Sequence, residues 1–423
     1  MIIRSIHLEN YRCFEDFDID FDDRLTVLVG SNGAGKTAVL DALSVFLQKA
    51  GHPENKKSSL FEFPVSSMAI GCKPEDIVYR LELQQGSNIN GNPLPLPLKF
   101  FDTYYGSIRL IATDDAVASL QMACQESTLC AAYMAGRFVL DEDSILKNSI
   151  YDPPVHAAFE NNFKRTIDYA STLSWFNNAD ADEARTMRDS GQKNELPELK
   201  AVREALSKAL LGHYERPRMY GNPPELIIYK QGTDIAYKVS QLSDGYRAML
   251  ALVMDLARRM AQAYGDEVSP GSSLLHVPAI VLIDEVELHL HPSWQQTVLN
   301  TLLDIFPNTQ FIVTTHSPQV LTSIPSRHIR ILNDGKAYSV GGQTQGAEAS
   351  RLLRQIFGVE LRPGSLPIVR ALRDYSKLVY EEKWDTPEAG ELREKLSEHY
   401  GNDDPELMEL DLHIENSKWE RGL

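Results

Sequence analysis

The stretch GSNGAGKT at residues 30–37 decides the fold of this chain. It matches the pattern G-x-x-x-x-G-K-[ST], in which glycines let backbone N–H groups curl around phosphate oxygens. The apolar run at residues 25–29 predicts a buried strand before it, and residues 38–47 predict an amphipathic helix after it. This strand–loop–helix order is the context that a phosphate-binding loop, or P-loop, requires, because the helix N-terminus adds partial positive charge.

The P-loop predicts a nucleotide-binding site. Lys36 is expected to reach the β- and γ-phosphates and so to act in catalysis. Thr37 is expected to offer its hydroxyl to Mg²⁺, so ATP and Mg²⁺ are the expected ligands. The residues expected to line the nucleotide are Asn32, Gly33, Ala34, Gly35, Lys36, Thr37 and Ala38.

Composition narrows the class of protein. The chain has 423 residues, enough for two or three domains, and a net charge of −17 at pH 7. That charge argues against a protein that coats DNA, since phosphate binding needs clustered Lys and Arg. The four cysteines form no C-x-x-C pair, which predicts reduced thiols and a cytoplasmic protein. We expect neither a signal peptide nor a membrane span, because no apolar run approaches ~18 residues.

Four regions of the chain differ in composition and in expected secondary structure. Residues 1–113 carry the P-loop among alternating strands, and residues 114–213 are typical of a helical insertion rich in Ala, Leu and charge. Residues 214–345 mix strands and helices as the second half of an α/β domain, and residues 346–423 predict a charged helical tail. The stretch at residues 91–97 is expected to be irregular, because each of its prolines removes a backbone donor.

Two acids follow an apolar strand expected at residues 279–283. Asp284 is expected to hold Mg²⁺, and Glu285 to orient and deprotonate the attacking water. In open α/β sheets, ligands bind beyond the carboxyl ends of the strands. His316 follows a second apolar strand, at residues 310–314, so parallel pairing would place it at the same edge. A neutral imidazole there can contact the γ-phosphate, which makes His316 a third catalytic candidate after the P-loop lysine and Glu285.

These motifs together resemble those of ABC-type ATPases of the SMC/RecF/OLD group. The resemblance rests on the P-loop after a two-strand ribbon, the LSDG sequence at residues 242–245, the acid pair and His316. It implies an α/β fold: an ABC-type (RecF/SMC-like) P-loop NTPase head with a mixed sheet, an antiparallel β subdomain and a helical insertion. In that group two heads dimerise, and each signature sequence completes the partner's ATP site. The resemblance therefore places Ser243, Asp244 and Gly245 among the nucleotide-binding residues, acting in trans.

The same resemblance suggests two further site residues, and the sequence departs from the family pattern at one position. Arg12, in the turn after the first strand, is expected to contact nucleotide phosphates, with a plain surface arginine as the alternative. Gln84 is the candidate for the glutamine that reaches Mg²⁺ in related heads. Asp244 stands where many signatures carry glycine, and an acid facing a γ-phosphate would repel it. Hydrolysis is therefore expected to be slow.

A closer resemblance is to the PtuA-like ATPases of anti-phage defence, found in Septu systems and some retrons. It rests on QLSDGYR at residues 241–247, on LIDE at 282–285 followed by HLHPSWQQ at 289–296, and on residues 306–320 around His316. By resemblance, such ATPases form homodimers or higher homo-oligomers through their heads and regulate a separate HNH nuclease. Nucleic acid would join through that complex, as DNA or as retron msDNA with its reverse transcriptase.

Two alternatives remain open. One is a RecF-like DNA-repair ATPase that binds duplex DNA as a head dimer, against which the net charge of −17 argues. The other is a scaffold in which ATP holds oligomers together with little turnover. A long heptad pattern is absent, which argues against an SMC-type or Rad-type arm, and no acidic-cluster nuclease domain of the OLD kind is visible.

Overall fold

The computed structural model describes most of the chain, in two compact units, Met1–Leu352 and Leu353–Leu423. The described residues are 1–50, 60–64, 68–69, 72–73, 76–84, 94–104, 107–112, 128–135, 169–190, 195–221, 224–264 and 272–420.

A six-stranded sheet forms the centre of the first unit. Its strands are β3 (Leu25–Val29), β8 (Leu129–Tyr133), β12 (Ala279–Ile283), β13 (Thr309–Thr314), β14 (Ile329–Asn333) and β15 (Lys336–Ser339). The order is β15-β14-β3-β13-β12-β8, with every neighbouring pair parallel except β14 and β15. The strands β3, β13, β12 and β8 are buried along their whole length, as expected of apolar strands covered on both faces. The carboxyl ends of these parallel strands therefore meet at one edge.

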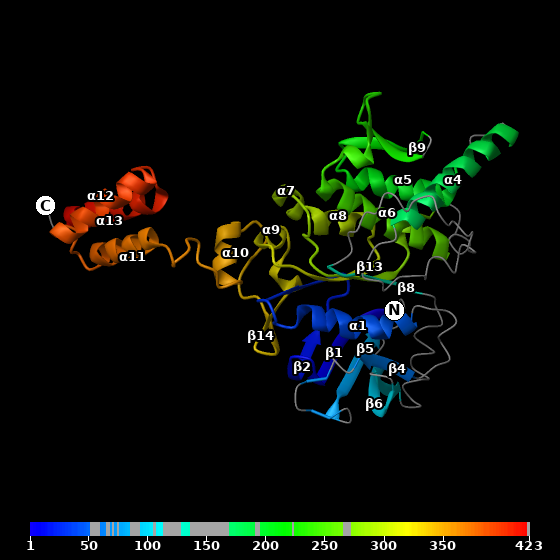
Figure 1. Ribbon diagram of the computed structural model, residues 1–423, viewed down its shortest axis with the longest axis horizontal. Coiled ribbons are helices and arrows are strands. Elements are labelled where there is room, and N and C mark those ends of the chain that lie inside the picture. Colours follow the sequence, from blue (N-terminus) through cyan, green and yellow to red (C-terminus); the bar gives the residue numbers. More distant parts are fainter. Residues whose placement is uncertain are drawn as a thin grey trace. The chain divides into compact units, whose positions relative to one another are not determined.

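A second, antiparallel sheet packs over the helix that follows the P-loop. Its order is β2-β1-β5-β6-β7-β4. The helix α1 (Lys36–Ala50) lies between the two sheets, where Leu43 and Phe46 share one core with Leu8 of the antiparallel sheet and Leu282 of β12 (Figure 1). The strands are β1 (Ile2–Tyr11), β2 (Phe14–Asp20), β4 (Leu60–Pro64), β5 (Val78–Gln84), β6 (Leu94–Tyr104) and β7 (Ser107–Ala112).

Helices cover the opposite face of the central sheet. Figure 1 shows α5, α6 and α8 on one side of β13 and β8, and α1 on the other. The longest of these three, α6, is buried along most of its length from Ala248 onward, and its mainly apolar buried side chains also include Asp255, Arg258 and Arg259. These helices and their neighbours are α4 (Tyr169–Ser190), α5 (Pro197–Ala209), α6 (Asp244–Tyr264), α7 (Pro292–Gln295), α8 (Val298–Ile305), α9 (Pro318–Leu321) and α10 (Ala349–Gln355).

A small antiparallel sheet precedes α6. Its strands are β9 (Tyr214–Tyr220), β10 (Glu225–Lys230) and β11 (Ala236–Lys238), in the order β11-β10-β9. The short turns η5 (Val239–Gln241), η6 (Leu274–His276) and η7 (Ser326–His328) are 3₁₀-helices. The strands β10 and β11 form an antiparallel hairpin within the second half of the α/β domain.

Two expectations about the fold are corrected. The predicted helical insertion contains α4 and α5, but it also supplies β8, which pairs with β12 from Leu129 to Tyr133. The short, Ala-containing β8 has little strand propensity of its own, so its pairing partner determines its structure. Within the proline-rich stretch, residues 94–97 also form a strand, since Pro95 and Pro97 lie in β6 opposite β5, and residues 91–93 lie outside the described residues. Prolines lack the N–H donor that pairing requires. The pairing of β6 with β7 begins only at Leu98, so the two prolines remove no hydrogen bond between β6 and β7.

The second unit is a helical bundle, as the charged tail predicted. It contains α11 (Pro367–Tyr380), α12 (Pro387–Tyr400) and α13 (Pro405–Glu420), which bury Leu372, Leu396 and Leu407 in a core of their own. Across both units, no helix within the described residues is long and apolar enough to cross a membrane.

Candidate nucleotide-binding site

The P-loop leaves β3 and enters α1 under tight packing. Gly35 has φ +96°, and a Cβ added there would lie 2.3 Å from the Phe14 ring and 2.9 Å from Cys13 Sγ. A side chain at this position would therefore collide with the turn between β1 and β2. Gly30 is equally confined, because its Cβ would lie 2.5 Å from the Leu332 carbonyl oxygen. The antiparallel sheet and β14 thus fix the shape of the loop.

Lys36 lies inside the P-loop. Its side chain is only 6% exposed, and its Nζ donates hydrogen bonds of 2.9 Å to the carbonyl oxygens of both Gly30 and Ser31. Burial lowers the pKa of Lys36, and the carboxylates of Asp284, Glu285 and Glu287 act in the opposite direction. The ammonium is therefore held at the base of the loop among three acids.

Asp284 brings the P-loop and the end of β12 together. Its carboxylate is 4% exposed and accepts hydrogen bonds from the hydroxyls of Thr37, at 3.1 Å, and Thr314, at 2.6 Å. Its backbone N–H donates to the Tyr133 carbonyl at the end of β8. Hydroxyl and carboxylate oxygens are hard donors, so Thr37 and Asp284 fit the preference of Mg²⁺.

Glu285 occupies an unusual backbone conformation next to this pair. Its φ is +49°, in the left-handed region that residues with side chains seldom adopt. Its N–H donates to the Thr314 hydroxyl at 2.7 Å, and the same hydroxyl donates to Asp284. Thr314 therefore fixes both acids at once. Strained backbone held by its surroundings is common at functional sites.

The loop that contains His316 is held by Glu287. The Glu287 carboxylate accepts from the His316 N–H at 2.6 Å and from the Thr315 hydroxyl at 2.7 Å. The Ser317 hydroxyl donates to the Gln295 side chain at 2.5 Å. Parallel pairing of β12 with β13 thus places His316 at the same sheet edge as Glu285, as the sequence suggested.

Sequence reasoning missed Thr314 and Glu287. Both lie beside predicted residues, Thr314 at the end of the second apolar strand and Glu287 two positions after Glu285. A polar residue at the carboxyl end of a buried strand was the available signal, since such residues gather at the ligand edge.

The signature residues pack against the loop that follows Glu285. Ser243 and Asp244 are exposed at the start of α6, whereas Gly245 is half-buried. A Cβ on Gly245 would lie 2.9 Å from the His289 carbonyl oxygen. The Tyr246 ring meets the Trp294 ring edge-on, with centroids 4.4 Å apart. The signature is therefore fixed to the loop beyond β12 in the same head.

Arg12 lies beside the helix of the P-loop. Its φ is +52°, and its guanidinium pairs with Asp41 of α1 at 2.7 Å. The structure thus brings Arg12 next to α1, with a carboxylate partner that the sequence did not suggest.

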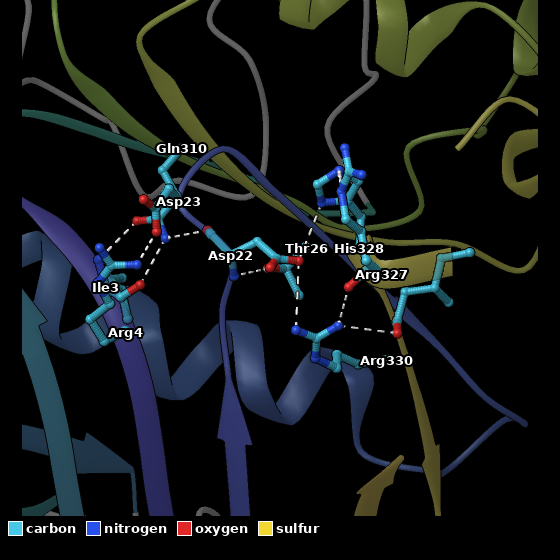
Figure 2. A network of polar contacts seen from close by, with 10 residues as sticks. Ile3, Arg4, Asp22, Asp23, Thr26, Gln310, Arg327, His328 and Arg330 are labelled. Atoms are coloured by element: carbon cyan, nitrogen blue, oxygen red, sulfur yellow. Dashed lines mark hydrogen bonds and ion pairs between the residues drawn. The ribbon is translucent and has the colours of Figure 1, made fainter. Parts of the chain in front are cut away.

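Gln84 is not brought to the site. It pairs with Ile2 at the start of β1, whereas the turn that touches the P-loop follows Tyr11 at the other end. Nine residues of strand separate these ends, or ~30 Å. The neighbouring Ile3 bonds to Gln310 at the amino end of β13, as Figure 2 shows. Only the backbone of Gln84 lies within the described part of the chain, and it lies at the wrong edge for a Mg²⁺ ligand.

Two family models and several known proteins are similar to this chain. Residues 1–89 match a family model described as AAA ATPase domain, and residues 136–322 match one described as AAA domain, putative AbiEii toxin, Type IV TA system. The retron Ec83 probable ATPase of Escherichia coli is 29% identical to this chain, and the match covers 99% of this chain and 87% of that ATPase. The Septu protein PtuA of Bacillus thuringiensis is 19% identical over 90% of each chain. A solved SMC head bound to the C-winged helix domain of ScpA has a TM-score of 0.48 at 15% identity, over 81% of this chain and 98% of that one.

The P-loop between β3 and α1, the acids at the end of β12 and the antiparallel sheet over α1 define the class: an ABC-type P-loop ATPase head of the SMC and RecF kind. Within that class the chain is similar, nearly end to end, to the retron Ec83 probable ATPase and to the Septu protein PtuA.

Proposed function

We propose that this chain binds and slowly hydrolyses Mg-ATP, and that the nucleotide state of its heads controls a partner HNH nuclease in anti-phage defence. The observation that carries the ATPase part is the cluster of Thr37, Asp284 and Thr314 beside the buried Lys36. Hydrolysis of a γ-phosphate needs positioning and charge neutralisation more than covalent chemistry, and these groups supply both.

The residues take separate parts in the proposed reaction. Lys36 exchanges the Gly30 and Ser31 carbonyls for phosphate oxygens when ATP enters the loop. Thr37 and Asp284 would hold Mg²⁺, which when bound neutralises the phosphate charge. Glu285 orients the attacking water and accepts its proton, and His316 contacts the γ-phosphate. Thr314 and Glu287 position these two residues through the bonds described above.

A second copy of the chain would complete the site. Ser243 and Asp244 are exposed, so a nucleotide held by another head can reach them. We infer that ATP joins the heads as a homodimer or as part of a higher homo-oligomer, with Ser243 and Gly245 at the partner's γ-phosphate. The regulated nuclease is inferred from the PtuA-like relationship and from the lack of a nuclease motif in the sequence.

Calorimetry with Mg-ATP tests the first part. The full chain should bind ATP, Lys36→Ala should not, and Glu285→Gln should bind ATP and retain it uncleaved. Failure of the full chain to bind ATP in Mg²⁺ would overturn the proposal. Strong, salt-sensitive binding of duplex DNA by the chain alone would favour a RecF-like repair role instead.

Co-expression tests the partner. The reading frames adjacent to the gene of this chain should include an HNH nuclease that co-purifies with it, and nucleic-acid cleavage by the complex should change between the wild type and Glu285→Gln. Equal cleavage with both proteins would contradict control by the ATPase.

A further inference from the structure

The signature sequence contains an ion pair. Asp244 is the first residue of α6, and its carboxylate accepts a hydrogen bond from the guanidinium of Arg247, one helical turn later. The Asp244 side chain is 75% exposed and that of Arg247 is 26% exposed. The acid that stands in place of the usual glycine is therefore accompanied by a cation, and the formal charges of the two side chains cancel.

The packing of the signature prevents the acid from turning away. Gly245 is pressed against the His289 carbonyl, where an added Cβ would lie 2.9 Å away, and Tyr246 is held against Trp294. These two contacts fix the rotation of the first turn of α6 about its axis. Asp244 consequently stays on the exposed end of the helix, where its charge can be offset by the side chain of Arg247 on the next turn.

We propose that Arg247 acts as a counter-ion of Asp244, and that it makes the signature acceptable to the triphosphate held by a second copy of this chain. The inference rests on the head-dimer part of the proposed function. Arg247 is a positioning residue: it holds the Asp244 carboxylate and cancels its charge, leaving Ser243 and the N–H groups of the first turn to meet the phosphate.

The proposal makes a prediction that a direct phosphate contact by Arg247 does not make. Removing Arg247 leaves a carboxylate facing a polyanion, whereas removing both charges leaves a neutral end with the glycine found in related signatures. The loss caused by Arg247→Ala should therefore be reversed by Asp244→Gly. A residue that itself binds the phosphate could not be replaced in this way.

The experiment is a double-mutant cycle on ATP-dependent association of the full chain. Association is measured by sedimentation in Mg-ATP, with Glu285→Gln in all proteins to prevent turnover. Arg247→Ala should weaken association at least about tenfold. It leaves the Asp244 carboxylate facing the phosphates of the partner head without its cation, and like charges that meet at an interface are costly. Asp244→Gly should associate at least as well as its parent, and the double variant should recover to within about threefold of Asp244→Gly.

A matched control separates this effect from the loss of any helical ion pair. Arg185 pairs with Asp182 on α4 at the same three-residue spacing, so Arg185→Ala removes one arginine without touching the signature. It should leave association unchanged, and melting temperatures should show that every variant folds. Failure of the double variant to recover, or no loss in Arg247→Ala, would overturn the counter-ion role alone. If the parent protein binds ATP yet gains no mass, the head dimer itself is wrong and this inference falls with it.

Discussion

The two edges of the central parallel sheet use polar side chains in opposite ways. At the amino edge, drawn in Figure 2, the Gln310 side chain accepts from the Ile3 N–H and donates to the Ile3 and Asp22 carbonyls, at 2.8 to 3.0 Å. Asp22 in turn pairs with His328 and Arg330. These donors and acceptors are matched within the chain, whereas the buried Thr309 hydroxyl at the same edge has no hydrogen-bond partner among the described residues.

The carboxyl edge is rich in carboxylates. Asp284, Glu285 and Glu287 all act on the buried ammonium of Lys36. Carboxylate oxygens gathered in this way are the kind of ligand that a divalent cation prefers, whereas at the amino edge Arg4 and Arg330 pair with Asp23 and Asp22. The contrast indicates that the amino edge contributes to stability and the carboxyl edge is adapted to a ligand. Substitutions at the two edges should therefore give different phenotypes.

The largest expected effect is that of Lys36→Ala. Two charge-assisted hydrogen bonds to phosphate are each worth about 1.5–3 kcal/mol, so ATP affinity should fall at least about 100-fold. Calorimetry measures it directly. Arg330→Met, which removes a cation from the amino edge, is the control and should bind ATP as the wild type does. Equal losses in the two variants would remove the distinction between the edges.

The second prediction concerns Glu285→Gln. The substitution keeps the shape of the side chain but removes the base, which typically contributes ~10²–10⁴-fold to a rate. Turnover should fall in that range, while ATP affinity stays within a few-fold of wild type. Steady-state phosphate release and calorimetry give the two values. Unchanged turnover would assign the proton transfer to another group.

The sequence predicted some parts of this site and not others, for physical reasons. The P-loop and its flanking strand and helix are contiguous, so a local pattern contains them, and β3 has the expected bounds. Asp284 and Glu285 were predictable because an apolar strand ended beside them. Gln84 depended on strand register, which a single sequence does not contain, and the pairing with Ile2 places it at the opposite edge.

The missed contacts share one cause. Glu287 holds the His316 loop only because β12 and β13 are neighbours, and Asp41 meets Arg12 only because α1 packs beneath the first turn. The strand β8 likewise exists through its pairing with β12 rather than through its own residues. Long-range pairing decides these features, and local periodicity carries no information about it.

The third prediction compares two threonines at opposite ends of β13. Thr314→Val leaves Asp284 without one donor and the Glu285 N–H without its acceptor, at about 1–3 kcal/mol each. Turnover should fall about tenfold, because Glu285 loses its support, and the melting temperature should drop.

Thr309→Val is the matched control for that variant. Thr309 is buried at the amino end of the same strand, and its hydroxyl has no hydrogen-bond partner among the residues that the structure describes. Replacing the Thr309 hydroxyl with a methyl group should leave turnover unchanged and keep the stability of the fold equal or slightly higher. If both variants lose turnover equally, strand packing rather than the Thr314 hydroxyl supports the catalytic edge.

The smallest expected effect is that of Asp22→Asn at the amino edge. The substitution leaves in place the bonds that the backbone of residue 22 makes with the side chains of Thr26 and Gln310. It weakens the side-chain contacts with His328 and Arg330, because the carboxylate loses its charge. Because these side chains are partly exposed, the loss of stability should be about 1 kcal/mol or less, seen as a small shift in denaturant midpoint. ATP affinity and turnover should not change, since no contact of Asp22 reaches the carboxyl edge in the part of the chain that is described. A change in turnover without a change in stability would mean that the two edges are coupled through β3, which begins at the amino edge and ends at the P-loop.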